Sequence, residues 1–240
     1  DAFRHRLMFP ICDETGSPIA FGGRRLNEED EPKYINSPET VLFHKSKTLY
    51  GYGHARQAIQ ESKKAIVVEG YTDVIACHQS GITNVVATLG TSLTKDHAEK
   101  LSRICDEVTL VFDGDDAGQS AADRAVKVFF SKSLDVRICV LPEGKDPADL
   151  ASDAEALNTY FDHAIEAIEF KLDRLEASLE PLDTIAGRTR MIESFLDELI
   201  RLGIENLGGV RKPLVYERIA TLVKTSMSEV ESYISSRSRM

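Results

Sequence analysis

An apolar run passes directly into an acidic turn in the middle of the chain, where the sequence reads Val108-Thr109-Leu110-Val111-Phe112-Asp113-Gly114-Asp115-Asp116-Ala117-Gly118. The run is short and rich in valine and lacks regular polar alternation, which is typical of a β-strand buried on both faces. Residues 65–68 form a second run of this kind, and Glu69 and Gly70 follow it directly. Two buried strands that both end in acid predict a parallel sheet with carboxylates along one edge.

Strand and helix patterns alternate outward from these two runs. We expect strands over 65–68, 84–87, 108–112 and 136–141, and helices over 55–64, 72–79, 94–105 and 117–130. Helices between buried strands are the crossovers of a parallel sheet. The sequence therefore predicts an α/β fold, in which a parallel sheet is flanked by helices.

The two ends of the chain have other patterns. Residues 7–11 and 19–22 read as strands around a turn over 13–16, which predicts a hairpin, and residues 27–53 read as a long polar connection. From residue 155 onward there is no strand signal, and apolar residues recur every three or four positions, including Ile165. We expect a small α+β segment over 1–64, the sheet domain over 65–150 and a helical subdomain over 151–240.

Composition and charge exclude several classes of protein. Hydrophobic residues make up 42% of the 240 residues and charged residues 28%, which argues against a disordered or fibrous chain. No apolar run approaches the roughly 20 residues that cross a bilayer, and no basic and apolar leader opens the chain. We expect a cytoplasmic protein without membrane contact, and an Asp at position 1 indicates a piece of a longer chain. The net charge of −10 alone disfavours a polyanionic partner. Bound metal ions would cancel the excess carboxylates, however, so the net charge does not exclude a phosphate-containing partner.

The cysteines do not have the spacing of a metal site. They are Cys12, Cys77, Cys105 and Cys139, separated by 65, 28 and 34 positions and without a CxxC pair. We expect buried, reduced thiols and no zinc site. The histidines show no paired spacing either, which favours surface or local structural roles.

Carboxylates follow three of the predicted strands. Their positions are Glu69 and Asp73, Asp113 and Asp115, and Asp146 with Asp149 close behind. Two carboxylates about 4 Å apart repel by roughly 4 kcal/mol at an effective dielectric constant near 20, so such a cluster needs cations. Oxygen ligands without Cys or His indicate Mg²⁺ or Mn²⁺. Asp116 instead has the position of a helix N-cap.

The acidic motifs resemble those of a known family. Glu69-Gly70-Tyr71-Thr72-Asp73-Val74, together with residues 113–118, resembles the TOPRIM module of primases, topoisomerases and some nucleases. Further segments are similar to the catalytic core of bacterial DnaG-type DNA primases: residues 6–11, 19–24, 32–40, 43–45, 49–51 and 89–91. The matches extend from residue 3 to about residue 150, whereas the helical tail agrees only in character.

The resemblance implies a template-directed RNA polymerase that makes short primers on single-stranded DNA by in-line nucleotidyl transfer. By motif position, the catalytic residues would be Glu69, Asp113 and Asp115. The metal ligands would be Glu69, Asp73, Asp113, Asp115, Asp146 and Asp149, with Mg²⁺ or Mn²⁺ as the cofactor. The family commonly has Asp-Pro-Asp in its last motif, whereas this chain has Ala148 in the third position, so whether Asp149 replaces that carboxylate stays open.

The same resemblance implies partners and basic contacts. Arg24, Lys33, Asn36 and Lys45 would contact nucleotide phosphates and the nucleic-acid backbone. The partners would be the single-stranded DNA template, ribonucleoside triphosphates, the RNA–DNA hybrid product and a replicative helicase, which would be contacted through a missing C-terminal region. Two alternatives stay open: another TOPRIM enzyme, such as a topoisomerase fragment or a nuclease, and a non-catalytic metal-binding module.

Overall fold

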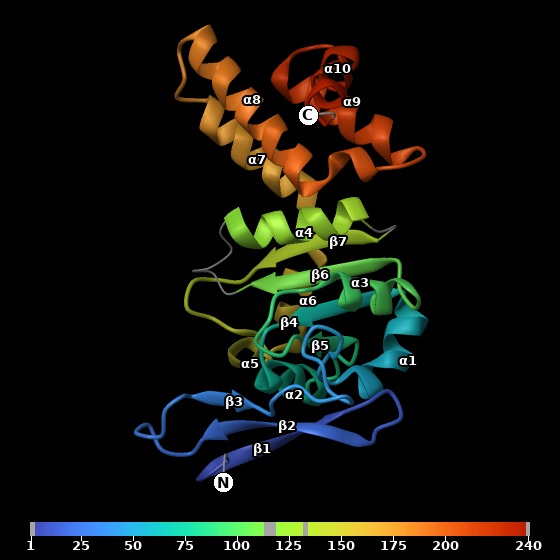
Figure 1. Ribbon diagram of the computed structural model, residues 1–240. Coiled ribbons are helices and arrows are strands. Elements are labelled where there is room, and N and C mark those ends of the chain that lie inside the picture. Colours follow the sequence, from blue (N-terminus) through green and yellow to red (C-terminus); the bar gives the residue numbers. More distant parts are fainter. Residues whose placement is uncertain (1–2, 113–118, 132–133, 239–240) are drawn as a thin grey trace.

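The computed structural model describes residues 3–112, 119–131 and 134–238, arranged in three parts that follow one another along the molecule (Figure 1). The strands are β1 (Arg6–Cys12), β2 (Pro18–Arg25), β3 (Tyr34–Asn36), β4 (Lys64–Val68), β5 (Val85–Ala87), β6 (Glu107–Phe112), β7 (Asp135–Val140) and β8 (Ile165–Glu166). The helices are α1 (Tyr52–Ser62), α2 (Tyr71–Gln79), α3 (Lys95–Ser102), α4 (Gln119–Ser131), α5 (Pro147–Leu150), α6 (Ala154–Asp162), α7 (Ala167–Leu179), α8 (Ile185–Leu202), the 3₁₀ turn η1 (Ile204–Asn206), α9 (Arg211–Val223) and α10 (Met227–Arg237).

The N-terminal part is an antiparallel sheet in the order β1-β2-β3. Asp13 Oδ1 accepts hydrogen bonds from the backbone N–H groups of Thr15 (2.8 Å) and Ser17 (3.0 Å), which closes the predicted hairpin. β3 was not expected, because it lies in the polar segment that reads as a connection. Its backbone pairs with β2, with Asn36 opposite Gly22, and an edge strand of three residues needs no apolar run.

The central sheet has the order β5-β4-β6-β7-β8, and its first four strands are parallel. Alternate strand residues face opposite sides: Val67 and Leu110 pack with α1, α3 and α4, whereas Val68 and Val111 pack with α2 and α6. Both faces of the sheet are therefore covered by helices, which confirms the predicted α/β fold.

β8 corrects two expectations for the tail. It pairs antiparallel with β7, with Ile165 opposite Ile138, so the sheet is not wholly parallel and the region after residue 155 does contain a strand. Ile165 belongs to this strand and is 44% exposed, although its spacing matches a helical face. β8 provides hydrogen-bond partners for the backbone groups at the edge of β7. The spacing of apolar side chains gives no information about this need for backbone pairing, so the strand was missed. The predicted division at residue 150 stays a prediction.

Two other expectations hold. Thr94 caps α3, since its side-chain oxygen accepts a hydrogen bond from the N–H of His97 (3.1 Å). Cys77, Cys105 and Cys139 are buried, as predicted, and burial raises the pKa of their thiols to about 12. Within the described ranges, no helix has both the length and the apolar character to span a bilayer.

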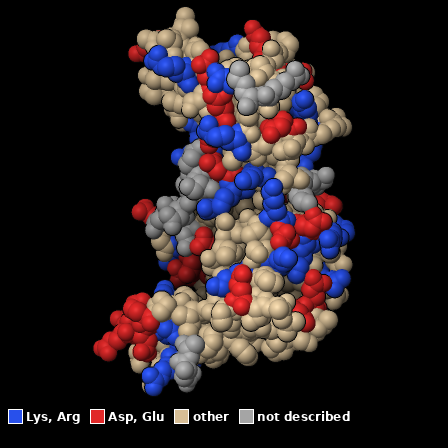
Figure 2. All heavy atoms as spheres, viewed as in Figure 1, with Lys and Arg blue, Asp and Glu red and all other residues tan. Residues whose placement is uncertain are grey.

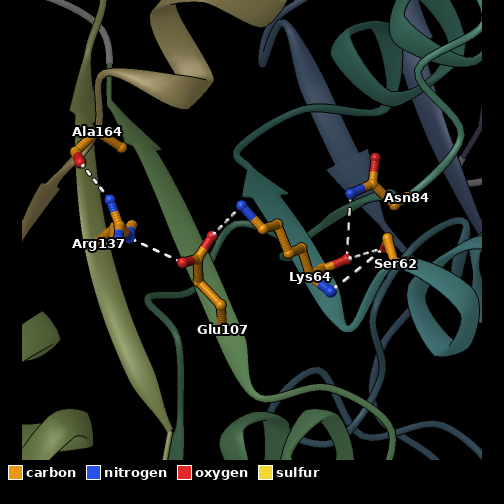
Figure 3. A network of polar contacts seen from close by, with 6 residues as sticks. All are labelled: Ser62, Lys64, Asn84, Glu107, Arg137 and Ala164. Carbon is orange, nitrogen blue, oxygen red and sulfur yellow. Dashed lines mark hydrogen bonds and ion pairs between the residues drawn. The ribbon is translucent and has the colours of Figure 1, made fainter.

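Charged side chains fix the amino-terminal ends of the central strands (Figure 3). Glu107 on β6 forms ion pairs with Lys64 on β4 (3.3 Å) and with Arg137 on β7 (2.8 Å). Arg137 also donates to the carbonyl of Ala164, directly before β8 (3.1 Å). The network holds three strands in register at the end of the sheet that lies opposite the predicted acidic edge.

A buried lysine connects the helical tail to the central part. Lys171 on α7 is only 2% exposed, and its ammonium group donates to Asp123 on α4 and to Glu198 on α8. Three helices from different parts of the chain therefore meet at one cation.

Tyr71 joins the N-terminal sheet to the central part. Its ring stacks on Phe9 (5.0 Å between centroids) and meets Tyr50 edge-on (4.8 Å), and its hydroxyl donates to the side-chain oxygen of Asn36. Burial raises the pKa of Tyr71 to about 12, so the hydroxyl is protonated at neutral pH. Gly22 makes room for the ring, because a Cβ atom at this position would lie 2.5 Å from it.

We expect Gly22→Ala to destabilise the chain by about 1–3 kcal/mol, because the added methyl group overpacks the Tyr71 ring. Urea unfolding followed by circular dichroism measures this loss. Gly208→Ala is the matched control, since a Cβ atom there meets nothing within 4 Å, and its effect should stay within about 0.5 kcal/mol. Equal stabilities of the two variants would contradict the described position of Tyr71.

Candidate catalytic site

The carboxyl ends of β4, β5 and β6 open onto a cavity of about 400 Å³. Glu69 lines it directly after β4, and Phe112 lines it at the end of β6. β4 and β6 are neighbouring parallel strands, with Val67 opposite Leu110, so the chain leaves both strands on the same edge. This is the position at which ligands bind in open α/β sheets.

Asp73 is held at the start of α2. It is 7% exposed, and its Oδ2 atom accepts a hydrogen bond from the N–H of Gly70 (3.0 Å). A Cβ atom on Gly70 would lie 2.8 Å from that oxygen, so glycine permits the close approach. The positive end of the helix dipole favours a carboxylate in the first turn. Asp73 thus lies about one helical turn after Glu69, and the glycine between them allows its carboxylate to fold back onto the backbone.

Asp146 lies where the chain continues from β7 into α5. It caps α5, because its Oδ1 atom accepts a hydrogen bond from the N–H of Asp149 (2.8 Å). α5 packs against α2, which carries Asp73. Asp149 is exposed in the first turn of the same helix. Asp146 and Asp149 therefore share one helix start at the acidic edge.

Asp113, Asp115 and Asp116 lie outside the described residues. The described residues alone contain no group of three or more His, Cys, Asp or Glu side chains that could hold a metal ion. Glu69, Asp73 and Asp146 offer carboxylate oxygens, the donors that Mg²⁺ and Mn²⁺ prefer. The chemistry of these donors thus fits a hard divalent cation.

The predicted basic residues fall into two groups. Arg24 and Lys33 lie together, because both cations are placed over the Tyr34 ring, at 5.7 Å and 5.8 Å from its centroid. Lys45 lies elsewhere, beside α3, where its carbonyl accepts a hydrogen bond from His97 Nε2 (2.9 Å). Burial lowers the pKa of His97, which keeps the ring neutral for this structural role.

Asn36 lies between the N-terminal sheet and the loop after β5. Its side-chain nitrogen donates to the carbonyl of Leu89 (3.2 Å), and its oxygen accepts the Tyr71 hydroxyl. Both ends of the amide are therefore engaged with the protein, next to the residues that lead to the cavity.

Figure 2 shows a recess at the left edge of the molecule, between the β1–β3 sheet and the central part, with acidic atoms inside it.

Arg124 and Thr91 are among the residues of the cavity lining that were not predicted from the sequence as part of the site. Arg124 reaches it from α4, and Thr91 reaches it from the loop after β5. The Thr91 hydroxyl is buried and makes no hydrogen bond to any residue that the structure describes. Two signals were available in the sequence: Thr91 lies four positions after the predicted strand over 84–87, and it belongs to the segment 89–91 that is similar to the primase core.

Comparison with known proteins identifies the family. Residues 66–151 match the Toprim-like family, and residues 1–56 match the N-terminal domain of the DNA primase catalytic core. The DNA primase of Clostridium acetobutylicum is 35% identical over 243 residues, which cover 96% of this chain and 40% of that protein. The chain thus spans about 40% of the length of this curated relative.

Solved structures agree with this assignment. A DNA primase domain from Pseudomonas aeruginosa has a TM-score of 0.85 and 36% identity, and the match covers 98% of this chain and 73% of that one. A DnaG primase catalytic domain bound to single-stranded DNA has a TM-score of 0.83 and 36% identity, with 95% and 72% of the two chains covered. With this identity and coverage, the chain belongs to the DnaG-type DNA primases and corresponds to part of their catalytic core.

Proposed function

We propose that this chain joins ribonucleotides into short RNA primers on a single-stranded DNA template, as the nucleotidyltransferase part of a bacterial DNA primase. The observation that carries the proposal is the cavity at the shared carboxyl edge of β4 and β6, with Glu69 in its wall. A relative of the same fold was solved with single-stranded DNA bound, which supports the template.

In this reaction, the acidic residues would bind metal ions and the basic residues would bind phosphates. The reaction would be an in-line attack of a ribose 3′-hydroxyl on the α-phosphorus of a nucleoside triphosphate, with pyrophosphate leaving. Glu69, Asp73 and Asp146 would hold Mg²⁺ or Mn²⁺, together with the undescribed Asp113 and Asp115. When bound, such ions lower the pKa of the attacking hydroxyl and neutralise the charge of the leaving group. Arg24 and Lys33, which both lie over the Tyr34 ring, would neutralise phosphates of the nucleotide or nucleic acid.

The alternatives are less well supported. A topoisomerase fragment or a nuclease shares the TOPRIM module, but residues 1–56 match the N-terminal domain of a primase core. A non-catalytic metal-binding module would have no need for an open cavity beside Glu69. The proposed setting is the bacterial cytoplasm, and the proposed partners are ribonucleoside triphosphates, the RNA–DNA hybrid and a helicase contacted by a region outside these residues.

Primer synthesis by the purified chain tests the proposal. The chain is incubated with single-stranded DNA, labelled ribonucleotides and Mg²⁺ or Mn²⁺, with a chelator in the control. Short labelled RNA that requires both template and metal is the expected product. Cleavage of the DNA without RNA synthesis would favour a nuclease, and metal binding without either reaction would favour the binding module.

The last acidic motif gives a separate prediction. We expect Asp146→Asn and Asp149→Asn each to raise the half-saturating Mg²⁺ concentration for primer synthesis by about tenfold or more, because both are predicted ligands at the start of α5, Asp146 as its N-cap and Asp149 in its first turn. Asn still caps a helix, so stability should hold.

Asp153→Asn is the control for these two variants. Asp153 caps α6 in the same way, accepting a hydrogen bond from the N–H of Ala156 (3.0 Å), and it is not a predicted ligand. A wild-type Mg²⁺ requirement in Asp149→Asn would show that Asp149 does not replace the carboxylate absent at Ala148.

A further inference from the structure

The outer side of α4 carries two cations. Arg124 and Lys127 are three positions apart and both exposed, whereas Ala125, Val126 and Val128 are buried against the sheet. Residues three apart lie on the same side of a helix, so the two cations form one short basic strip. Figure 2 shows lysine and arginine atoms gathered across the molecule at the level of α4.

The strip begins at the candidate catalytic site. Arg124 lines the 400 Å³ cavity, together with Glu69 and Phe112. α4 is the crossover between β6 and β7, so it runs back from the acidic edge and carries Lys127 about one turn farther from the cavity. A strand of nucleic acid that leaves the cavity over α4 would therefore meet Arg124 first and Lys127 next.

The side-chain charges of Arg124 and Lys127 do not stabilise the fold through contacts with the described part of the chain. Neither Arg124 nor Lys127 forms an ion pair or hydrogen bond with a residue that the structure describes, although acids outnumber bases in the sequence by 39 to 29. Their helix is held in place by its buried side and by the contact of Asp123 with Lys171. Two exposed cations on a fixed helix beside an acidic cavity are suited to hold a polyanion that carboxylates would otherwise repel.

We infer that Arg124 and Lys127 form a contact surface for backbone phosphates of the nucleic acid that occupies the cavity, an inference that rests on the proposed function. The contacts are to phosphate, so they position the strand and read no sequence. The same chemistry fits a single strand or the RNA–DNA hybrid, and the two are separated by experiment.

The test measures the salt dependence of binding with the double variant Arg124→Gln/Lys127→Gln. Affinity for a single-stranded DNA and for an RNA–DNA hybrid is measured by fluorescence anisotropy between about 50 mM and 200 mM salt. Loss of two phosphate contacts should reduce the slope of log affinity against log salt by about 1.4 on a single strand, or about 1.8 on a duplex. On a single strand, this is about a sevenfold smaller loss of affinity over that fourfold range of salt.

The control removes the same charge from the helical tail, with Arg201→Gln/Lys224→Gln, and should keep the wild-type slope. A reduced slope on only one of the two nucleic acids identifies that one as the ligand. If wild type makes primers but the α4 variant keeps the wild-type slope on both, the inference is overturned while the proposed function stands. If wild type makes no primers, the proposed function fails first.

Discussion

Glu69→Gln is expected to reduce primer synthesis at least about 10²-fold while leaving the fold intact. The substitution keeps the size of the side chain and removes one negative charge from the cavity wall. Without that charge, the site would hold a divalent cation less tightly and would lose the group that accepts or organises the reacting proton. Rates of RNA synthesis on a single-stranded template, over a range of Mn²⁺ concentrations, measure the effect.

The control for this prediction is Glu176→Gln, at an exposed position of α7. It changes the net charge by the same amount and should leave the rate within about twofold. Circular dichroism should show the thermal midpoints of both variants within about 2 °C of wild type. Normal primer synthesis by a folded Glu69→Gln chain would remove Glu69 from the reaction and, with it, the proposed role of the cavity.

The central sheet was predictable because strands buried on both faces consist mainly of apolar residues. Residues 65–68 and 108–112 are apolar on both faces, and the structure buries both faces under helices. Parallel strands between helices then fix which edge Glu69 occupies. The acidic edge follows from topology, without knowledge of any contact between side chains.

Two short edge strands, β3 and β8, were not predictable in the same way. β3 and β8 contribute three and two residues, and both are held by backbone pairing to the strand beside them. Their side chains carry no alternation, and Ile165 even fits the spacing of the helical tail. Unpaired backbone groups at a sheet edge can form hydrogen bonds with a neighbouring segment whatever its side chains are, so the sequence pattern does not predict such a strand.

Contacts between distant segments were also missed. The resemblance assigns Asn36 to nucleotide binding, a role that stays a prediction, whereas the structure shows its amide bonded to Tyr71 and Leu89. Arg124 enters the cavity only because α4 packs on the sheet in one orientation. Such positions depend on partners more than 30 positions away, and local patterns contain no information about them.

The helical tail is held to α4 by Lys171, and Lys171→Met is expected to cost about 3–5 kcal/mol of folding free energy at neutral pH. In sequence, Lys171 looks like a solvated lysine next to the core residue Leu172. Its burial depends on Asp123, 48 positions earlier, and on Glu198, 27 positions later. Without the ammonium group, two carboxylates would face each other in a poorly solvated space.

The pH dependence of this loss gives the sharper test. Burial raises the pKa of Asp123, and the contact with Lys171 opposes that rise, so the pKa climbs further in Lys171→Met. An acid whose pKa is raised on folding costs the full amount of stability above its folded pKa, and that cost shrinks as the pH falls from the folded pKa to the lower pKa of the unfolded chain. Urea unfolding should therefore show a smaller gap between wild type and variant near about pH 5 than near about pH 7.5. Lys171→Met/Asp123→Asn/Glu198→Gln, which removes all three charges, should recover at least about half of the lost stability. A gap that does not change with pH, or a triple variant as unstable as the single one, would mean that Lys171 acts through packing and not by balancing the two carboxylates.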